Sequence, residues 1–184
     1  MTKPLVVISG LPGSGKSTLG GQLARTLSLR LLDKDDILER LFESKGLGNA
    51  EWRKALSRES DEMLKTEAAL PGGAVLVSHW HLPGMPADSG TPTGWISQLS
   101  NSVVSVHCKC PVELSAERFA QRERHPGRLD RERSRDEILA SIRRVASFGA
   151  LDIGPRIEVD TSQAPDFASV IREVRRSLEI PDPI

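Results

Sequence analysis

Short apolar runs alternate with longer segments of helical periodicity along this chain. The apolar runs lie at residues 5–8, 29–32, 74–77, 103–107 and 157–159. Continuous apolar runs of this length are typical of parallel strands that are buried on both faces of a sheet. Alternation of such strands with helices indicates an α/β fold in three layers. The pattern therefore predicts a five-stranded parallel sheet with helices on both faces.

The predicted helices occupy much of the remaining sequence. They cover 16–27, a segment that begins near 37, and 51–70, 112–122, 134–148 and 165–178. A segment rich in proline, glycine, serine and threonine, 78–93, favours turns and loops. The segment 122–135 contains six arginines around His125-Pro126-Gly127 and has too few apolar residues for a core, so we expect an exposed, movable flap.

Length and charge restrict the classes of partner. A chain of 184 residues with 38% hydrophobic residues is sufficient for one domain with a full core. The 25 basic and 25 acidic residues cancel, so the overall charge attracts neither nucleic acid nor an anionic membrane. The apolar run at the start is too short for a signal peptide or a membrane span. We therefore expect a cytoplasmic protein without nucleic-acid or membrane partners; the sequence has no signature of oligomeric state.

The two cysteines are expected to be reduced thiols in or near the core. Cys108 and Cys110 are two residues apart in a predicted strand. Their side chains then point to the same face, where a disulfide between them would be badly strained.

A phosphate-binding loop follows the first predicted strand. The sequence from Gly10 to Thr18, Gly-Leu-Pro-Gly-Ser-Gly-Lys-Ser-Thr, matches glycine, four residues, and Gly-Lys-Ser/Thr between a strand and a helix. Glycines let successive N–H groups converge on phosphates, and the following helix directs its positive end at them. Lys16 supplies a charge to the transferring phosphoryl group, and the Ser17 hydroxyl suits Mg²⁺. The expected nucleotide-binding residues are Gly10, Pro12, Gly13, Ser14, Gly15, Lys16, Ser17 and Thr18.

Three aspartates follow the second predicted strand. Asp33 and Asp35 are two residues apart, so both face the carboxyl edge of the sheet, where open α/β sheets bind ligands. One carboxylate can hold Mg²⁺ or its waters while the other orients and deprotonates an acceptor hydroxyl. We expect Asp36 to point away and cap a helix that begins at Ile37. The alternative is that all three aspartates only cap and solubilise this helix start.

The loop from Gly10 to Thr18, together with Leu31-Leu-Asp-Lys-Asp-Asp-Ile-Leu, resembles small-molecule P-loop kinases of the shikimate kinase, gluconate kinase, chloramphenicol phosphotransferase and zeta-toxin type. This resemblance implies that Asp35 is the base on the acceptor hydroxyl and that Asp33 lies on the magnesium side. It also implies an arginine-rich lid at 122–135. In these kinases the loop after the last strand packs on adenine, which implies that role for Asp160, Thr161 and Ser162.

Arginines of the lid are candidates for catalysis. Guanidinium groups that close over the leaving phosphoryl group stabilise its spreading charge and exclude water. Arg122, Arg124 and Arg128 are the candidates, and Arg118, one helical turn before Arg122, can reach the same phosphates or the adenine. Acidic residues alternate with these arginines, so a solvated salt-bridged face explains many of them, and we expect one or two to be catalytic.

The third predicted strand ends in Ser78-His79-Trp80-His81, which differs from the pattern of the small-molecule P-loop kinases at this position. Ser78 can meet a metal-bound water, and His79, Trp80 and His81 are candidate substrate contacts: the tryptophan can stack on a ring, and a histidine can donate to a polar group. The alternative is a polar loop with one packed tryptophan. A transition-metal site at the two histidines lacks an evident third ligand.

These features predict a kinase that moves the γ-phosphate of ATP, with Mg²⁺, to a hydroxyl of a small molecule. The acceptor remains open among a sugar, a sugar acid, another metabolite and an antibiotic. Alternatives are a nucleoside, nucleotide or polynucleotide end kinase, a toxin kinase, and a non-catalytic nucleotide-binding module. The sequence lacks the Asn-Lys-x-Asp and Asp-x-x-Gly motifs of guanine-nucleotide switches, which disfavours a switch.

Overall fold

A computed structural model describes residues 3–123, 125–129 and 133–181. Five parallel strands form one sheet in the order β2-β3-β1-β4-β5. The strands are β1 (Leu5–Gly10), β2 (Arg30–Asp33), β3 (Ala74–Val77), β4 (Val103–Lys109) and β5 (Arg156–Asp160). The predicted five-stranded parallel sheet is therefore confirmed.

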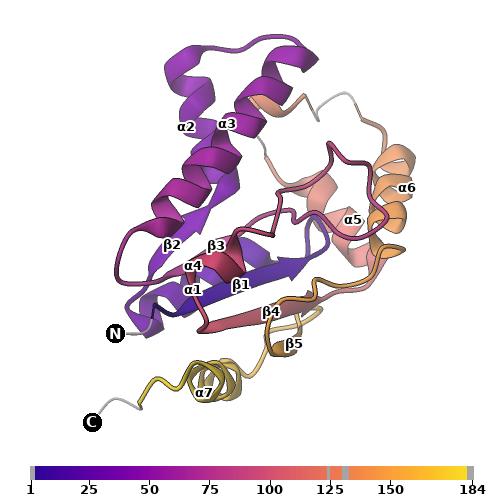
Figure 1. The fold of residues 1–184 in the computed structure, drawn as a ribbon. Helices are drawn as coiled ribbons and strands as arrows, with labels where there is room; N and C mark the ends of the chain where they lie inside the picture. Colours follow the sequence, from indigo (N-terminus) through magenta and orange to yellow (C-terminus); the bar gives the residue numbers. More distant parts are fainter. Residues whose placement is uncertain (1–2, 124, 130–132, 182–184) are drawn as a thin grey trace.

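Helices cover both faces of the sheet (Figure 1). Helices α1 (Lys16–Leu27) and α7 (Phe167–Leu178) pack on one face, while α3 (Ala50–Ala69), the short α4 (Ile96–Leu99) and the segment after β3 pack on the other. The remaining helices are α2 (Lys34–Lys45), α5 (Val112–Gln121), the 3₁₀ helix η1 (Pro126–Arg128) and α6 (Arg135–Ala146). Within the described ranges, no helix is both long enough and apolar enough to span a bilayer.

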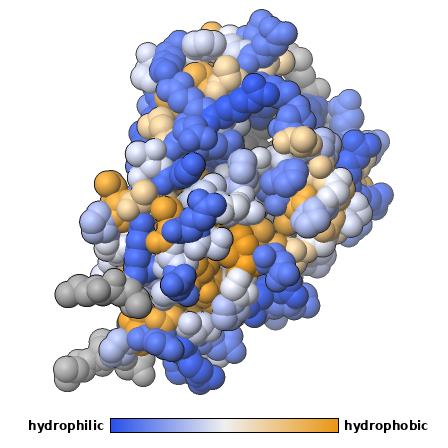
Figure 2. All heavy atoms as spheres, viewed as in Figure 1, coloured by the Kyte–Doolittle hydropathy of each residue, from blue (hydrophilic) through white to orange (hydrophobic). Residues whose placement is uncertain are grey.

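The central strand β1 explains the layered architecture. Leu5 and Val7 face the core on the α3 side, and Val6 and Ile8 face the core on the α1–α7 side. All four are fully buried, and burial of each such side chain stabilises the fold by about 1.5–3 kcal/mol. Figure 2 shows hydrophilic atoms over most of one face of the molecule, with hydrophobic atoms gathered over the sheet.

The start of α2 differs from the prediction. The helix begins at Lys34, three residues before the expected Ile37, and its N-cap is Asp33 rather than Asp36. The Asp33 carboxylate accepts a hydrogen bond from the Asp35 backbone N–H at 2.9 Å, which satisfies one of the amides that a helix start leaves open. Asp33 is therefore both the last residue of β2 and the N-cap of α2, with no loop between the two elements.

Part of the expected flap is packed rather than exposed. The rings of His125 and Phe42 stack with centroids 5.2 Å apart. Gly127 and Arg128 are buried, and a Cβ added to Gly127 would lie 2.7 Å from the Phe42 ring. In Figure 1 the segment that contains η1 crosses from α5 toward α2 and α3. The part of the lid at residues 125–128 is thus docked on α2 through an aromatic contact that composition alone did not indicate.

Replacement of Phe42 tests this docking. Phe42→Ala removes a buried ring that packs with Leu38, Leu41 and Leu56 and stacks on His125, so we expect the free energy of unfolding in urea to fall by about 3–5 kcal/mol. Trp52→Ala, at a 40% exposed ring on α3, is the control and should cost about 1 kcal/mol or less. Equal losses in the two variants would contradict the docked lid.

Candidate active site

The phosphate loop connects β1 to α1 at the carboxyl edge of the sheet. Gly13 adopts a positive φ of 82° against α5, and a Cβ there would lie 2.2 Å from the Ser115 carbonyl oxygen. Gly15 is the N-cap of α1 with a φ of 88°, and no side chain caps the helix. The first N–H groups of α1 are therefore left for an anion, and the positive end of the helix favours one there.

Lys16 lies across this loop. Its Nζ donates to the backbone oxygens of Gly10 at 3.0 Å and Leu11 at 2.8 Å. Burial lowers the pKa of Lys16, and the carboxylates of Asp35 and Asp33 oppose part of that effect. The charge of Lys16 is therefore held against the loop that would bind phosphate.

Ser17 and Asp33 form an oxygen pair beside the loop. The Ser17 hydroxyl donates to Asp33 Oδ2 at 2.6 Å, and Asp33 is 5% exposed. Burial raises the pKa of Asp33 to about 6, against the opposing effect of the Ser17 hydrogen bond. Hydroxyl and carboxylate oxygens are hard ligands of the kind that Mg²⁺ takes, together with water and phosphate oxygens. These two residues, which the sequence analysis assigned to the metal, therefore fit Mg²⁺.

Asp35 is paired with an arginine of the lid. Arg128 Nη1 donates to Asp35 Oδ1 at 2.7 Å, and Arg128 Nη2 donates to the Asp35 carbonyl oxygen at 2.9 Å and to Glu39 Oε1 at 3.2 Å. Arg128 is only 5% exposed. Two of the predicted catalytic residues, separated by 93 positions in the chain, are thus in direct contact.

A cleft of about 580 Å³ contains these groups. The loop residues Pro12, Gly13, Gly15, Lys16, Ser17 and Thr18 line it together with Asp33, Asp35, Ser78 and His79. Within the described ranges, five arginines also line it: Arg53, Arg118, Arg122, Arg128 and Arg133. The cleft is therefore strongly cationic although the chain as a whole is neutral.

Two of these arginines, Arg53 and Arg133, are not among the site residues predicted from the sequence. Arg53 projects from α3, and its Nε is buried without a hydrogen-bond partner among the described residues. Arg133 comes from the segment just before α6. A polar-faced helix gives no indication of which of its arginines faces a cleft, so only the packing of α3 beside β2 identifies Arg53. Arg124, another predicted lid arginine, lies outside the described residues.

Arg118 joins α5 to the loop after β5. Its Nη1 donates to the Thr161 carbonyl oxygen at 2.8 Å, and its Nη2 donates to the Ser162 carbonyl oxygen at 2.9 Å. The Thr161 hydroxyl donates to the Lys109 carbonyl oxygen at 3.0 Å. Thr161 is buried behind Gly15 and does not line the cleft, whereas Arg118 does. The adenine role of this loop stays a prediction.

The segment after β3 divides between the cleft and the core. Ser78 lines the cleft, and its hydroxyl is 2.6 Å from that of Thr91. His79 also lines the cleft, and burial, with a smaller effect of Lys16, lowers the pKa of His79 to about 4. His79 is therefore a neutral hydrogen-bonding group at pH 7.

Trp80 and His81 do not reach the cleft. Trp80 is 3% exposed, and its Nε1 donates to the Ile8 carbonyl oxygen at 2.7 Å. His81 Nδ1 is 2.6 Å from the Ser89 carbonyl oxygen. The packed-tryptophan alternative therefore describes Trp80 better than a substrate contact in this cleft. Among the described residues, no group of three or more His, Cys, Asp or Glu side chains is arranged to hold a metal, and both cysteines are free thiols.

Comparisons with known proteins identify kinases as relatives of this chain. Shikimate kinase from Corynebacterium glutamicum is 40% identical over 86 residues, which are 41% of this chain and 50% of that enzyme, so the match spans about half the length of this relative. Cytidylate kinase from Pyrobaculum islandicum is 25% identical over 182 residues, 95% of this chain and 91% of that enzyme.

A solved structure extends the similarity to the whole fold. A candidate kinase from Chloroflexus aurantiacus has a TM-score of 0.74 and 24% identity, over 97% of both chains. The family model described as AAA domain matches residues 6–140, which hold the phosphate loop, both aspartates and the lid. The chain therefore belongs to the AAA domain family and has the α/β P-loop fold of its kinase neighbours.

Proposed function

We propose that this protein is an ATP- and Mg²⁺-dependent phosphotransferase that moves the γ-phosphate to a hydroxyl of a small anionic acceptor. The observation that carries the proposal is the Asp35 carboxylate, which lies in the same cleft as Lys16 and the Ser17–Asp33 pair. A nucleotide-binding module needs the loop and the metal pair. It does not need a further carboxylate directed into the cleft beside them.

Different residues of the cleft have different roles in an in-line transfer of the phosphoryl group. The loop amides and Lys16 bind the phosphates, and Ser17 and Asp33 would hold Mg²⁺, which would supply positive charge to the phosphate oxygens. Asp35 orients the acceptor hydroxyl and takes its proton as the new oxygen–phosphorus bond forms and ADP leaves. Arg128 contacts Asp35 and therefore lies where it can also stabilise charge on the moving phosphoryl group.

The arginines of the cleft support an anionic acceptor. Arg118 is held on the loop after β5, on the predicted adenine side, whereas Arg53 comes from α3. A buried guanidinium nitrogen without a partner is costly, and a carboxylate or phosphate would supply one. The named acceptors of the two kinds of relative, shikimate and cytidylate, are both anions.

A nucleotide kinase is the second candidate function. The specific observation in its favour is coverage: the similarity to the cytidylate kinase extends over 95% of this chain, whereas the similarity to the shikimate kinase extends over 41%. The two candidates share the cleft and differ in the acceptor.

An acceptor panel separates the candidates. ADP release from Mg-ATP is measured with hydroxy acids, sugar acids, neutral sugars, hydroxylated antibiotics and nucleoside monophosphates, and each product is identified by mass. We expect a hydroxylated anion to raise turnover far above background hydrolysis. Turnover with a nucleoside monophosphate alone would select the nucleotide kinase, and a flat panel with tight ATP binding would favour a binding module.

Asp35→Asn tests the base. The amide cannot accept the proton, so we expect the transfer rate to fall by about 10²–10⁴-fold with little change in ATP binding by calorimetry. Asp36→Asn, at the adjacent exposed position of α2, is the matched control and should retain the rate. Near-normal turnover in Asp35→Asn would refute the role of this carboxylate.

Arg53→Gln tests the anion site. Loss of a charged hydrogen bond to the acceptor should raise the KM for the acceptor about tenfold or more and leave the KM for ATP within about twofold. Arg58→Gln is the control on the same helix, because Arg58 is exposed and outside the cleft lining. Equal changes in the two variants would remove Arg53 from the acceptor site.

Asp33→Asn tests the metal pair through stability as well as activity. The folded state raises the pKa of Asp33 from 3.8 to about 6, so the protonated form stabilises the fold at low pH and that stability is lost as pH rises through about 6. In Mg²⁺-free buffer at pH 8, we expect the free energy of unfolding in urea to be about 1–3 kcal/mol higher for the variant than for the wild type. This difference should vanish near pH 4. Mg-ATP turnover should nevertheless be lost.

The control for this measurement is Asp152→Asn, at an exposed position before β5, which should shift stability by less than about 0.5 kcal/mol at either pH. A pH-independent stability difference for Asp33→Asn would contradict the buried, raised carboxyl.

A further inference from the structure

The sheet face on the α3 side becomes polar toward β5. Ser9 of β1 is in register with His107 of β4, which is in register with Glu158 of β5. On the same face of β1, Leu5 and Val7 are fully buried core residues. A sheet face that is covered by helices is normally apolar, and the row of three polar side chains at the carboxyl end of this face differs from that pattern.

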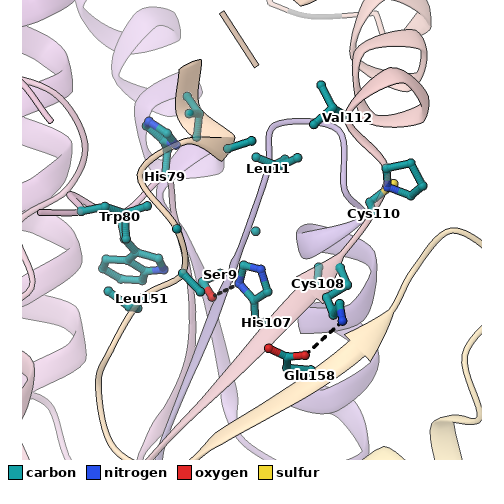
Figure 3. Close-up of a pocket in the computed structure, with 18 of the residues that line it drawn as sticks. Ser9, Leu11, His79, Trp80, His107, Cys108, Cys110, Val112, Leu151 and Glu158 are labelled. Carbon is teal, nitrogen blue, oxygen red and sulfur yellow. Dashed lines mark hydrogen bonds and ion pairs between the residues drawn. The ribbon is translucent and has the colours of Figure 1, made fainter. Parts of the chain in front are cut away.

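A cavity of about 790 Å³ lies over this polar row (Figure 3). Trp80 and Leu151 lie on one side of it, and Leu11 and Val112 border it on another. Ala146, the last residue of α6, also lines it. The volume and the mostly apolar walls with a few polar groups are those of a small-molecule site.

This cavity is separate from the phosphate cleft. Of the described residues that line the two spaces, His79 alone is shared. The described lining of the cavity contains no arginine, whereas the cleft has five. Two carboxylates line the cavity, Glu158 and Asp160. Glu158 is paired with Lys109 at 3.2 Å and lies 3.8 Å from Arg156, and Asp160 accepts a hydrogen bond from the Ser162 backbone N–H at 2.8 Å. The cavity therefore does not suit a phosphate or another strong anion.

Within the polar row, the imidazole of His107 can form a hydrogen bond with a ligand. The Ser9 hydroxyl is 3.0 Å from His107 Nδ1, and Ser9 is buried. Burial lowers the pKa of His107, so the imidazole is neutral at pH 7 and has one donor and one acceptor nitrogen. A ligand hydroxyl both donates and accepts, and therefore suits the second ring nitrogen in either tautomer.

The phosphate loop forms one wall of the cavity. Gly10 and Leu11 line it, and their carbonyl oxygens are the acceptors of the Lys16 ammonium. The Leu11 side chain also packs against the α5–α6 cluster that includes Ala116, Ile138 and Ile142. A molecule in the cavity would therefore contact the segment that positions Lys16.

We propose that this cavity is a second ligand site, for an uncharged, mainly apolar molecule that carries a hydroxyl, and that its occupancy changes nucleotide affinity. The site does not depend on the identity of the phosphate acceptor.

Three probes with one ring system test the site. Indole-3-ethanol is neutral and has a hydroxyl, indole-3-acetate is an anion, and tryptamine is a cation. The full-length protein is saturated with Mg-ADP, and the imidazole signals of its four histidines are followed by NMR during titration. We expect indole-3-ethanol to shift the His107 signals saturably, and the two charged probes to bind at least fivefold more weakly.

A filled cavity is the matched control. Ala146→Phe places a ring in the cavity and should weaken indole-3-ethanol at least tenfold, whereas Ala140→Phe, at an exposed position of the same helix, should not. Circular dichroism checks that both variants are folded. If Ala146→Phe does not fold, His107→Gln, which removes the imidazole contact, should weaken the probe at least threefold.

Other outcomes overturn the proposal. Saturable binding of indole-3-ethanol to the ADP-free protein but none to the Mg-ADP-saturated protein would place it in the phosphate cleft, and unchanged affinity in Ala146→Phe or the absence of a saturable shift would remove the site. ADP affinity measured with and without saturating probe should differ at least twofold; an unchanged value would refute the coupling through the phosphate loop.

Discussion

The carboxylate of Asp33 joins three elements of this fold. One oxygen accepts from the Asp35 backbone N–H and so starts α2, and the other accepts from the Ser17 hydroxyl in the first turn of α1. Since Asp33 is also the last residue of β2, this one buried side chain fixes the strand end against both helices. The positions of Lys16 and Asp35 relative to each other follow from that junction. Its burial carries an electrostatic cost, visible in the raised pKa of about 6.

The cationic cleft is the counterpart of this buried carboxylate. The chain has no net charge, yet its cleft combines five arginines and Lys16 with two aspartates. These arginines come from α3, α5 and the lid, which are distant in sequence and meet only in the folded protein. Docking of the lid through Phe42 and His125 brings Arg128 onto Asp35. An aromatic contact outside the cleft therefore contributes to the geometry within it.

Local patterns predicted the fold because parallel strands and phosphate loops are local features. The strand Ala74–Val77 has the predicted bounds because Gly73 precedes it and all four of its residues are buried. The helix Lys16–Leu27 has the predicted start because Gly15 is its N-cap. Long-range packing could not be predicted from these local sequence patterns. An aromatic residue such as Trp80 can stack on a ligand ring, but its indole N–H donates a hydrogen bond to the carbonyl oxygen of Ile8, 72 residues away in the chain. The cleft position of Arg53 likewise depends on how α3 packs, which its polar face does not encode.

The same distinction explains the second cavity. Ser9, His107 and Glu158 lie on three different strands, and only the sheet register places them in one row. Each residue by itself is an ordinary polar position near a strand end. Together they leave part of the sheet face without an apolar surface to cover, and the chain from the end of α6 to β5 passes around the space rather than filling it. The phosphate loop thus has a cationic cleft on one side and a nearly neutral, apolar cavity on the other. Two spaces of such different polarity favour two different kinds of molecule, with Gly10 and Leu11 between them.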